Sequence, residues 1–142
     1  MIGYFNAARA WVNCFERFTA ILEPFMPYQA PVREYQFIFD QIVPLAPVVA
    51  NECFSEATQD LTDAVLNECG KMCEEVMAPL QRPGDMHPAK LENGVVRTSP
   101  GFADGYVAIA EGGWVGISAS PTHGGMGLPL ALNTAMHDMM CG

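Results

Sequence analysis

Two cysteines and a histidine are the residues whose spacing comes nearest to a metal site. Cys69 and Cys73 stand four residues apart, which places both thiols on one face of a helix, and His87 could supply a third ligand. Structural zinc usually takes four ligands, however, and both cysteines fall on the apolar stripe of a predicted helix. We therefore predict that the two cysteines pack in the core and that the chain binds no metal.

A glycine-rich run beginning at His123 is the second candidate site. His123 would act as a general base only with an orienting partner and a substrate within hydrogen-bond reach, and the neighbouring sequence offers neither. No strand precedes the glycines between 124 and 127, and no Lys-Ser or Lys-Thr follows them, so a tight turn is favoured over a phosphate cradle. Glu111, the nearest carboxylate, is predicted to be solvated at a helix end. No catalytic residue is predicted in this chain.

The composition limits the partners and the compartment. A chain of 142 residues, half of them hydrophobic, is long enough for one domain with its own core. The net charge of −9 argues against nucleic acid, and no apolar run approaches the roughly 20 residues of a membrane span. Five cysteines, an odd number without the spacing of a disulfide framework, favour a reducing compartment, so we expect a cytoplasmic protein.

The hydrophobic pattern predicts an all-α domain of five or six helices, with one short hairpin or irregular loop near residues 85–98. Helices are expected over about 11–25, 31–42, 60–80, 100–111 and from 130 onward. Pro31 and Pro100 are expected at first helical positions, and Pro44 and Pro47 are expected to bend the chain. The Asn93-Gly94 pair predicts the turn of the hairpin.

The segment 60–80 is the most regular of these helices. Thr58 is expected to cap it, and Gly70 is expected to weaken its middle slightly. Its predicted buried face comprises Leu61, Ala64, Val65, Cys69, Met72, Cys73, Val76 and Met77, and its predicted solvated face comprises Asp63, Asn67, Lys71, Glu74 and Glu75.

The last two predicted helices should both bury large side chains, but only the first of them ends at a clear stop signal. Ser99 is expected to cap the first of them, which ends at Gly112-Gly113 and is followed by a buried Trp114. Its residues predicted to point inward are Phe102, Tyr106 and Ile109. In the final helix the apolar pattern of Met136, Met139 and Met140 still runs when the sequence stops, so we expect this surface to be exposed and the chain to be incomplete.

Four motifs in order resemble the acyl-CoA dehydrogenase family. They are Tyr28-Gln-Ala-Pro31 with Arg33 to Phe39, Gly101-Phe102 through Gly112-Gly113-Trp114, Gly124-Gly125-Met126-Gly127-Leu128-Pro129, and His137-Asp-Met-Met140. The resemblance covers roughly Met26 to the end and is nearest to the bacterial branch that includes the methylmercaptopropionyl-CoA dehydrogenases. Position 123 departs from the family pattern, in which an aromatic residue precedes the glycine pair.

The resemblance implies a three-part flavoenzyme of which this chain supplies the first part. Residues 27–142 would be the N-terminal helical domain, truncated before the middle β domain, and residues 1–26 an upstream extension that is either a genuine helix or the product of an upstream start codon. The intact enzyme, a homo-oligomer, would hold FAD between its later domains. It would oxidise an acyl-CoA thioester to the 2,3-enoyl-CoA with a glutamate base beyond this chain, and an electron-accepting partner would reoxidise the flavin.

For this chain the resemblance implies one wall of the acyl pocket. The residues expected nearest the substrate are His123, Gly124, Gly125, Met126, Gly127 and Leu128, followed by the helix after them. The methionines of that helix are expected to touch an acyl chain, to face neighbouring domains, or both. Without the later domains, this chain is expected neither to turn over substrate nor to retain FAD.

The alternative is a non-catalytic helical interaction module derived from the same family. A DNA-damage-response relative within the superfamily is disfavoured by the acidic charge.

Overall fold

The computed structural model describes residues 27–142, of which 64% lie in helices and 5% in strands. The prediction of a mostly helical chain is confirmed. The helix predicted over 11–25 and the proposed boundary after residue 26 concern positions outside the described residues. None of the described helices is long and apolar enough to span a bilayer.

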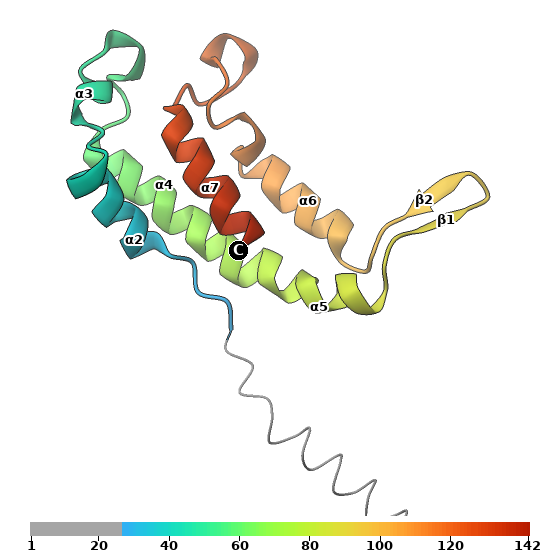
Figure 1. Cartoon of the computed structure of the whole chain (residues 1–142). Coiled ribbons are helices and arrows are strands. Elements are labelled where there is room, and N and C mark those ends of the chain that lie inside the picture. Colours follow the sequence, from blue (N-terminus) through green and yellow to red (C-terminus); the bar gives the residue numbers. More distant parts are fainter. Residues whose placement is uncertain (1–26) are drawn as a thin grey trace, which may run out of the picture.

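Several other helices of the described residues pack along one long helical rod (Figure 1). It comprises α4 (Gln59–Met72), a π-helical turn η3 (Cys73–Met77) and α5 (Ala78–Met86). The predicted cap is confirmed, since the Leu61 amide donates to Thr58 Oγ1 at 3.4 Å. The predicted end near Leu80 is wrong: Pro79 lies in the first turn of α5, where a missing N–H is tolerated, and the rod therefore continues to Met86.

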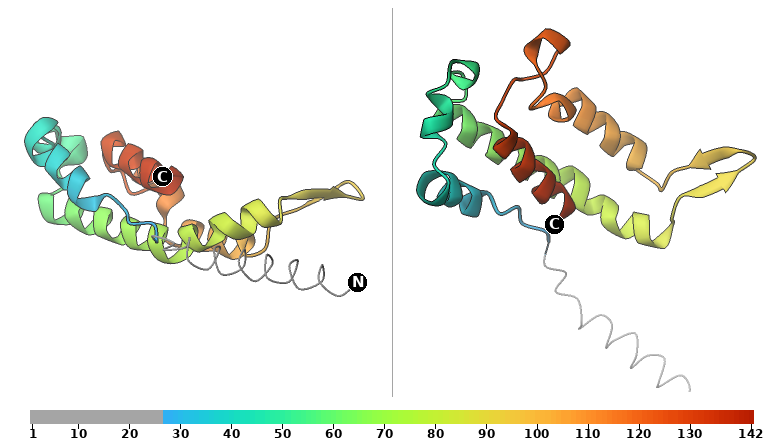
Figure 2. Two further views of the ribbon diagram at one scale, coloured as in Figure 1. Left: turned by 60° about the horizontal axis from the view of Figure 1, so that its bottom comes forward. Right: turned by 45° about the horizontal axis from the view of Figure 1, so that its top comes forward.

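The buried face of the rod differs from the predicted one. Cys69, Met72 and Cys73 are buried as expected, but Leu61 and Ala64 are exposed. Thr62, Leu66 and Gly70, which were not predicted, are buried instead. These three positions lie on the side that α2 and α7 cover, and the two helices lie on the same side of the rod in Figure 2.

Gly70 has a packing role that its helix propensity does not reveal. A Cβ at this position would lie 2.6 Å from Val32 Cγ2 and 3.1 Å from Ala30 Cβ. The missing side chain therefore lets the segment before α2 lie directly on α4.

The region between Pro31 and the rod is a series of short helical turns. Helix α2 (Val32–Phe37) continues into a π-helical turn η1 (Ile38–Ile42), which ends before Pro44 as predicted. Pro31 is the residue before the helix rather than its first residue, a difference of one position. At the predicted bend the chain forms α3 (Ala46–Val49), with Pro47 in its first turn, and the 3-10 turn η2 (Glu52–Phe54).

The predicted hairpin is confirmed. Strand β1 (Lys90–Glu92) pairs antiparallel with β2 (Val95–Arg97), and the connecting Asn93 and Gly94 have φ of 52° and 78°. Positive φ at both central residues is the geometry of a two-residue type I′ turn. The hairpin projects beyond the end of the rod (Figure 2).

Helix α6 (Phe102–Glu111) starts later than predicted and faces differently. Its N-cap residue is Gly101, with φ of 81°, and no side chain accepts a hydrogen bond from the first turn. The prediction that Ser99 caps this helix and that Pro100 is its first residue is therefore wrong. Ser99 is buried, and its carbonyl accepts from the Phe102 amide at 3.2 Å.

Two of the three side chains of α6 predicted to point inward are exposed. Phe102 and Tyr106 are 40% and 68% exposed, whereas Ile109 is half-buried and Gly105 is buried. A Cβ at Gly105 would lie 2.5 Å from Leu80 Cδ1, and a Cβ at Gly84 of α5 would lie 2.9 Å from Phe102 Cζ, so α6 and α5 approach each other at a glycine on each helix. The predicted end at Gly112-Gly113 and the burial of Trp114, which opens the 3-10 turn η4 (Trp114–Gly116), are confirmed.

The final helix α7 (Leu130–Cys141) starts at Leu130, as predicted. The expectation that its methionine face is exposed is wrong, because Met136 and Met139 are 3% and 2% exposed and Met140 is half-buried. These side chains pack against the rod, and the apolar core of the described residues runs between α7 and α4.

Candidate functional site

An apolar cavity of about 390 Å³ lies where α5, α6 and the end of α7 meet. Its walls are mainly side chains without charge: Tyr28, Met77, Leu80, Phe102, Tyr106, Ile109, Met139, Met140 and Cys141. The exposed Phe102 and Tyr106 thus face a concavity as well as solvent. The cavity has the size and apolar character of a small-molecule site.

Two tyrosines fix the segment before the rod onto the last turns of α7. Tyr28 Oη donates to the Met139 carbonyl at 2.6 Å, and Tyr35 Oη donates to Asp138 Oδ2. The Met139 carbonyl belongs to the last turn of α7, where helix carbonyls lack intrahelical partners, so Tyr28 also serves as a cap. One wall of the cavity is therefore held by a bond between positions 111 residues apart.

Both tyrosines keep their protons well above neutral pH. Burial raises the pKa of Tyr28, and the nearby Cys73 and Asp138 raise it further. Burial, followed by the hydrogen bond to Asp138, raises the pKa of Tyr35 to about 12. The phenols therefore act here as hydrogen-bond donors.

Cys69 and Cys73 are core residues, as predicted. Both side chains are buried, and the interaction between their thiols, with burial as the second cause, raises the pKa of Cys69. Only Cys73 reaches the cavity. Within residues 27–142, no three His, Cys, Asp or Glu side chains are grouped so that they could hold a metal ion.

The glycine-rich loop is folded on itself. It follows the 3-10 turn η5 (Pro121–His123), and successive amides donate to carbonyls of the same loop region. The donors are Gly124, Gly125, Met126, Gly127 and Leu128, and the acceptors are Pro121, Ser120, Gly116, Ala119 and Ile117. Because these amides are already bonded within the loop, the loop does not fit a phosphate cradle.

The absence of a Cβ at Gly125 has a packing reason. A Cβ there would lie 2.2 Å from the Ala119 carbonyl oxygen, so this position requires glycine to close the loop. The tight turn favoured by the sequence is confirmed.

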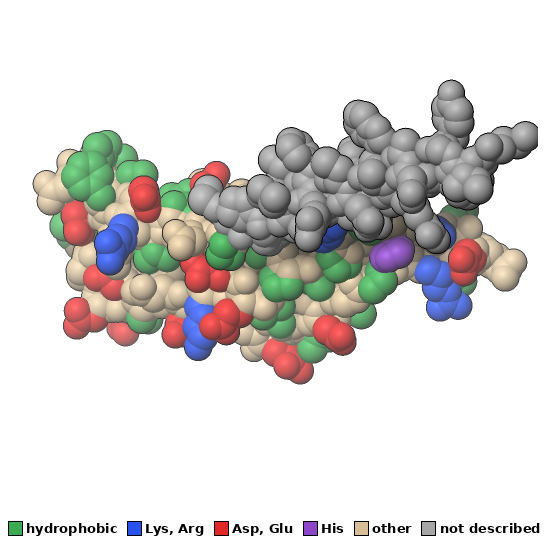
Figure 3. All heavy atoms as spheres, turned by 90° about the horizontal axis from the view of Figure 1, so that it is seen from below, with side chains coloured by type: hydrophobic (Ala, Val, Ile, Leu, Met, Phe, Trp, Pro, Cys, Tyr) green, Lys and Arg blue, Asp and Glu red, His purple; other side chains and the backbone are tan. Residues whose placement is uncertain are grey.

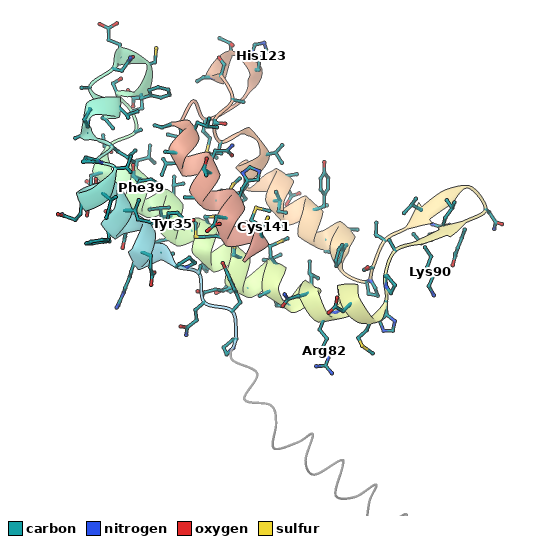
Figure 4. All side chains as sticks on the ribbon, in the orientation of Figure 1. Tyr35, Phe39, Arg82, Lys90, His123 and Cys141 are labelled. Atoms are coloured by element: carbon teal, nitrogen blue, oxygen red, sulfur yellow. The ribbon has the colours of Figure 1, made fainter. Side chains whose placement is uncertain are left out.

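His123 is exposed at the tip of this loop. Its Nδ1 lies 3.1 Å from Thr122 Oγ1, which in turn lies 2.8 Å from Ser120 Oγ. This chain of three side chains orients the imidazole, but it includes no carboxylate. In Figure 4 His123 lies away from Cys141, which lines the cavity.

The structure separates the residues predicted to contact substrate from the cavity. None of the loop residues 123–128 lines it, although Met139 and Met140 of the following helix do. Sequence reasoning did not identify Tyr28, Phe102 and Tyr106 as cavity residues. The signal was present in the aromatic pair four residues apart on α6, but that pattern was interpreted as a core face.

Acidic side chains outnumber basic ones on one face of the described part of the protein. Figure 3 shows Asp and Glu side chains spread along the described part of one face, with fewer Lys and Arg among them. This distribution agrees with the net charge of −9.

Comparison with known proteins identifies a protein of similar sequence. No protein-family model matches this chain. Its sequence is similar, however, to part of an acyl-CoA dehydrogenase. That protein is the 3-methylmercaptopropionyl-CoA dehydrogenase of Ruegeria pomeroyi, which is 37% identical over 115 residues. The matched stretch covers 81% of this chain and 20% of the relative, so the chain spans about a fifth of the length of the curated relative it matches.

Proposed function

We propose that this chain is the N-terminal part of an FAD-dependent acyl-CoA dehydrogenase and that it forms one wall of the acyl pocket. The observation that carries the proposal is the 37% identity over 115 residues to a dehydrogenase of this kind. The intact enzyme removes one hydrogen from each of two adjacent carbons of an acyl-CoA thioester, which yields the 2,3-enoyl-CoA. It is a homo-oligomer whose flavin and catalytic base come from outside the described residues.

The apolar cavity supports this assignment. An acyl chain has no polar groups to satisfy, and the cavity offers thioether and aromatic side chains, among them Met140 and Tyr106. Methionine adapts to irregular apolar ligands because its side chain is unbranched and polarizable. In this proposal the cavity receives the acyl chain, and the loop 123–128, which does not line the cavity, contacts another part of the acyl-CoA.

A chimera tests the proposal. The matched 115-residue stretch of the Ruegeria enzyme is replaced by the corresponding part of this chain, and FAD content and oxidation of 3-methylmercaptopropionyl-CoA are measured. We expect a flavin-loaded, active chimera. A chimera that folds and binds FAD but oxidises none of the acyl-CoA thioesters offered to it would refute the proposal.

Two variants of the chimera locate the pocket wall. Met140→Trp narrows the cavity and should raise KM for the thioester about tenfold, since a mismatch of this size in an apolar pocket is worth about 1–3 kcal/mol. Met86→Trp is the matched control, because Met86 is exposed on α5 and does not line the cavity. Equal KM values for the two variants would contradict the assignment of the cavity.

A further inference from the structure

The hairpin is an exposed two-stranded unit with open edges. All six strand residues are exposed, Leu91 by 74% and Val96 by 61%. An isolated two-stranded hairpin is only marginally stable in water, and exposed strand edges readily pair with another chain. No other strand is present in the described residues to pair with either edge.

The turn geometry fixes which backbone groups point outward. In a two-residue type I′ hairpin the residues that flank the turn, here Glu92 and Val95, exchange backbone hydrogen bonds with each other. Because bonded and non-bonded pairs alternate along antiparallel strands, Leu91 and Val96 form a non-bonded pair. The N–H and C=O of Leu91 therefore point away from β2, along the free edge of β1.

The sequence of β1 is self-complementary about Leu91. We propose that β1 pairs edge to edge with β1 of a second copy of this chain, antiparallel and two-fold symmetric, to form a four-stranded sheet. Leu91 then faces Leu91 of the second copy, and each exchanges its N–H and C=O with the other. In the same register Lys90 faces Glu92 of the second copy, and Glu92 faces Lys90, so two oppositely charged pairs form.

Electrostatics within the hairpin favour the same arrangement. Lys90 lies directly opposite Arg97, and like charges at opposite positions destabilise a ladder. A carboxylate from the second copy beside Lys90 offsets this repulsion. Figure 4 shows Lys90 on the part of the hairpin that lies beyond the helices, where a second copy has access.

The other edge lacks this complementarity. A two-fold pairing of β2 centred on Val96 would place Val95 opposite Arg97, which forms no charge pair. Pairing through β1 also brings Leu91 and Val96 of both copies onto one face of the sheet, because cross-strand partners point to the same side. The surface buried by three residues per strand is small, so the dimer is reversible.

Sedimentation velocity on the full chain tests the proposal without flavin or thioester, so its outcome is independent of the proposed function. We expect conversion from monomer to dimer as the concentration rises from about 10 µM to 1 mM. Leu91→Pro removes the outward N–H and should abolish the dimer. Val96→Pro is the matched control, because it removes the outward N–H of the opposite edge and should leave the dimer intact.

Charge reversal provides a second test that does not rely on proline. Lys90→Glu and Glu92→Lys should each weaken the dimer about tenfold, since two attractive pairs become repulsive. The double variant should restore it. Lys90→Glu also faces Arg97 favourably within its own hairpin, so its loss of dimer would not reflect an unfolded hairpin. A chain that stays monomeric at 1 mM, or a dimer equally sensitive to both proline variants, would overturn the proposal.

Discussion

Replacing Gly70 by alanine should destabilise the protein, although alanine is the better helix former. In an exposed helix interior, Gly→Ala stabilises by about 1 kcal/mol. Here the new Cβ would lie 2.6 Å from Val32 Cγ2, a distance at which one of the two groups must move. Overpacking of this kind costs about 1–3 kcal/mol. The net effect is a loss of up to about 2 kcal/mol in the free energy of unfolding.

A double-mutant cycle in urea denaturation measures this effect. Val32→Ala removes the methyl group that the new Cβ would strike, so Gly70→Ala in that background should recover most of the propensity gain, about 1 kcal/mol. The sign of the Gly70→Ala effect therefore reverses between the two backgrounds. If Gly70→Ala stabilised the wild-type chain by the full propensity difference, the close approach of Val32 to α4 would be refuted.

Three further predictions concern single side chains. Thr62 is 1% exposed and its Oγ1 has no hydrogen-bond partner, so Thr62→Val should raise the free energy of unfolding by about 1 kcal/mol in urea denaturation, whereas Thr62→Ser should lower it. The pKa of Tyr35 is raised in the fold from 10.0 to about 12, so its contribution to stability is complete below pH 10 and is lost as the pH rises to 12. Thermal melts of Tyr35→Phe should accordingly show a smaller loss of Tm across this window than the wild type, and equal slopes would contradict the role of its bond to Asp138. Met139→Ala should lose about 2–5 kcal/mol of unfolding free energy, whereas Leu130→Ala, at a position 68% exposed, should change it by less than about 0.5 kcal/mol.

The elements that were predicted correctly from the sequence are those determined by neighbouring residues. The Asn93-Gly94 turn, the Thr58 cap and the start of the final helix at Leu130 each depend on a few adjacent residues, and each is present. The position of Trp114 in the core also follows from its size and its place after a glycine stop.

The facing of the helices could not be predicted in the same way. Ala64 was expected to be buried and is exposed, whereas Gly70, which was not expected to be buried, is buried. The reason is that α2 approaches α4 at Gly70, and this contact depends on Val32, which is distant in sequence. Similarly, Gly105 rather than Tyr106 packs against α5. A hydrophobic pattern identifies buried faces by their apolar side chains. Close helix packing instead uses glycine, which has no side chain and does not contribute to such a pattern.

The candidate site shows the same limit. The sequence directed attention to the loop after His123, where glycines and a titratable side chain coincide, but the glycines there serve to close the loop. The cavity is assembled from segments as far apart as Tyr28 and Met140, and no local motif records their meeting. Of the residues expected near a ligand, those that also line the cavity belong to the final helix and are Met139, Met140 and Cys141.

The bond from Tyr28 to Met139 joins positions 111 residues apart, and that from Tyr35 to Asp138 joins positions 103 residues apart. Contacts of such high sequence separation close a large loop, so they form late and slow the folding rate. During synthesis from the N-terminus, the segment that carries both tyrosines must wait, without its final partner, until α7 has left the ribosome.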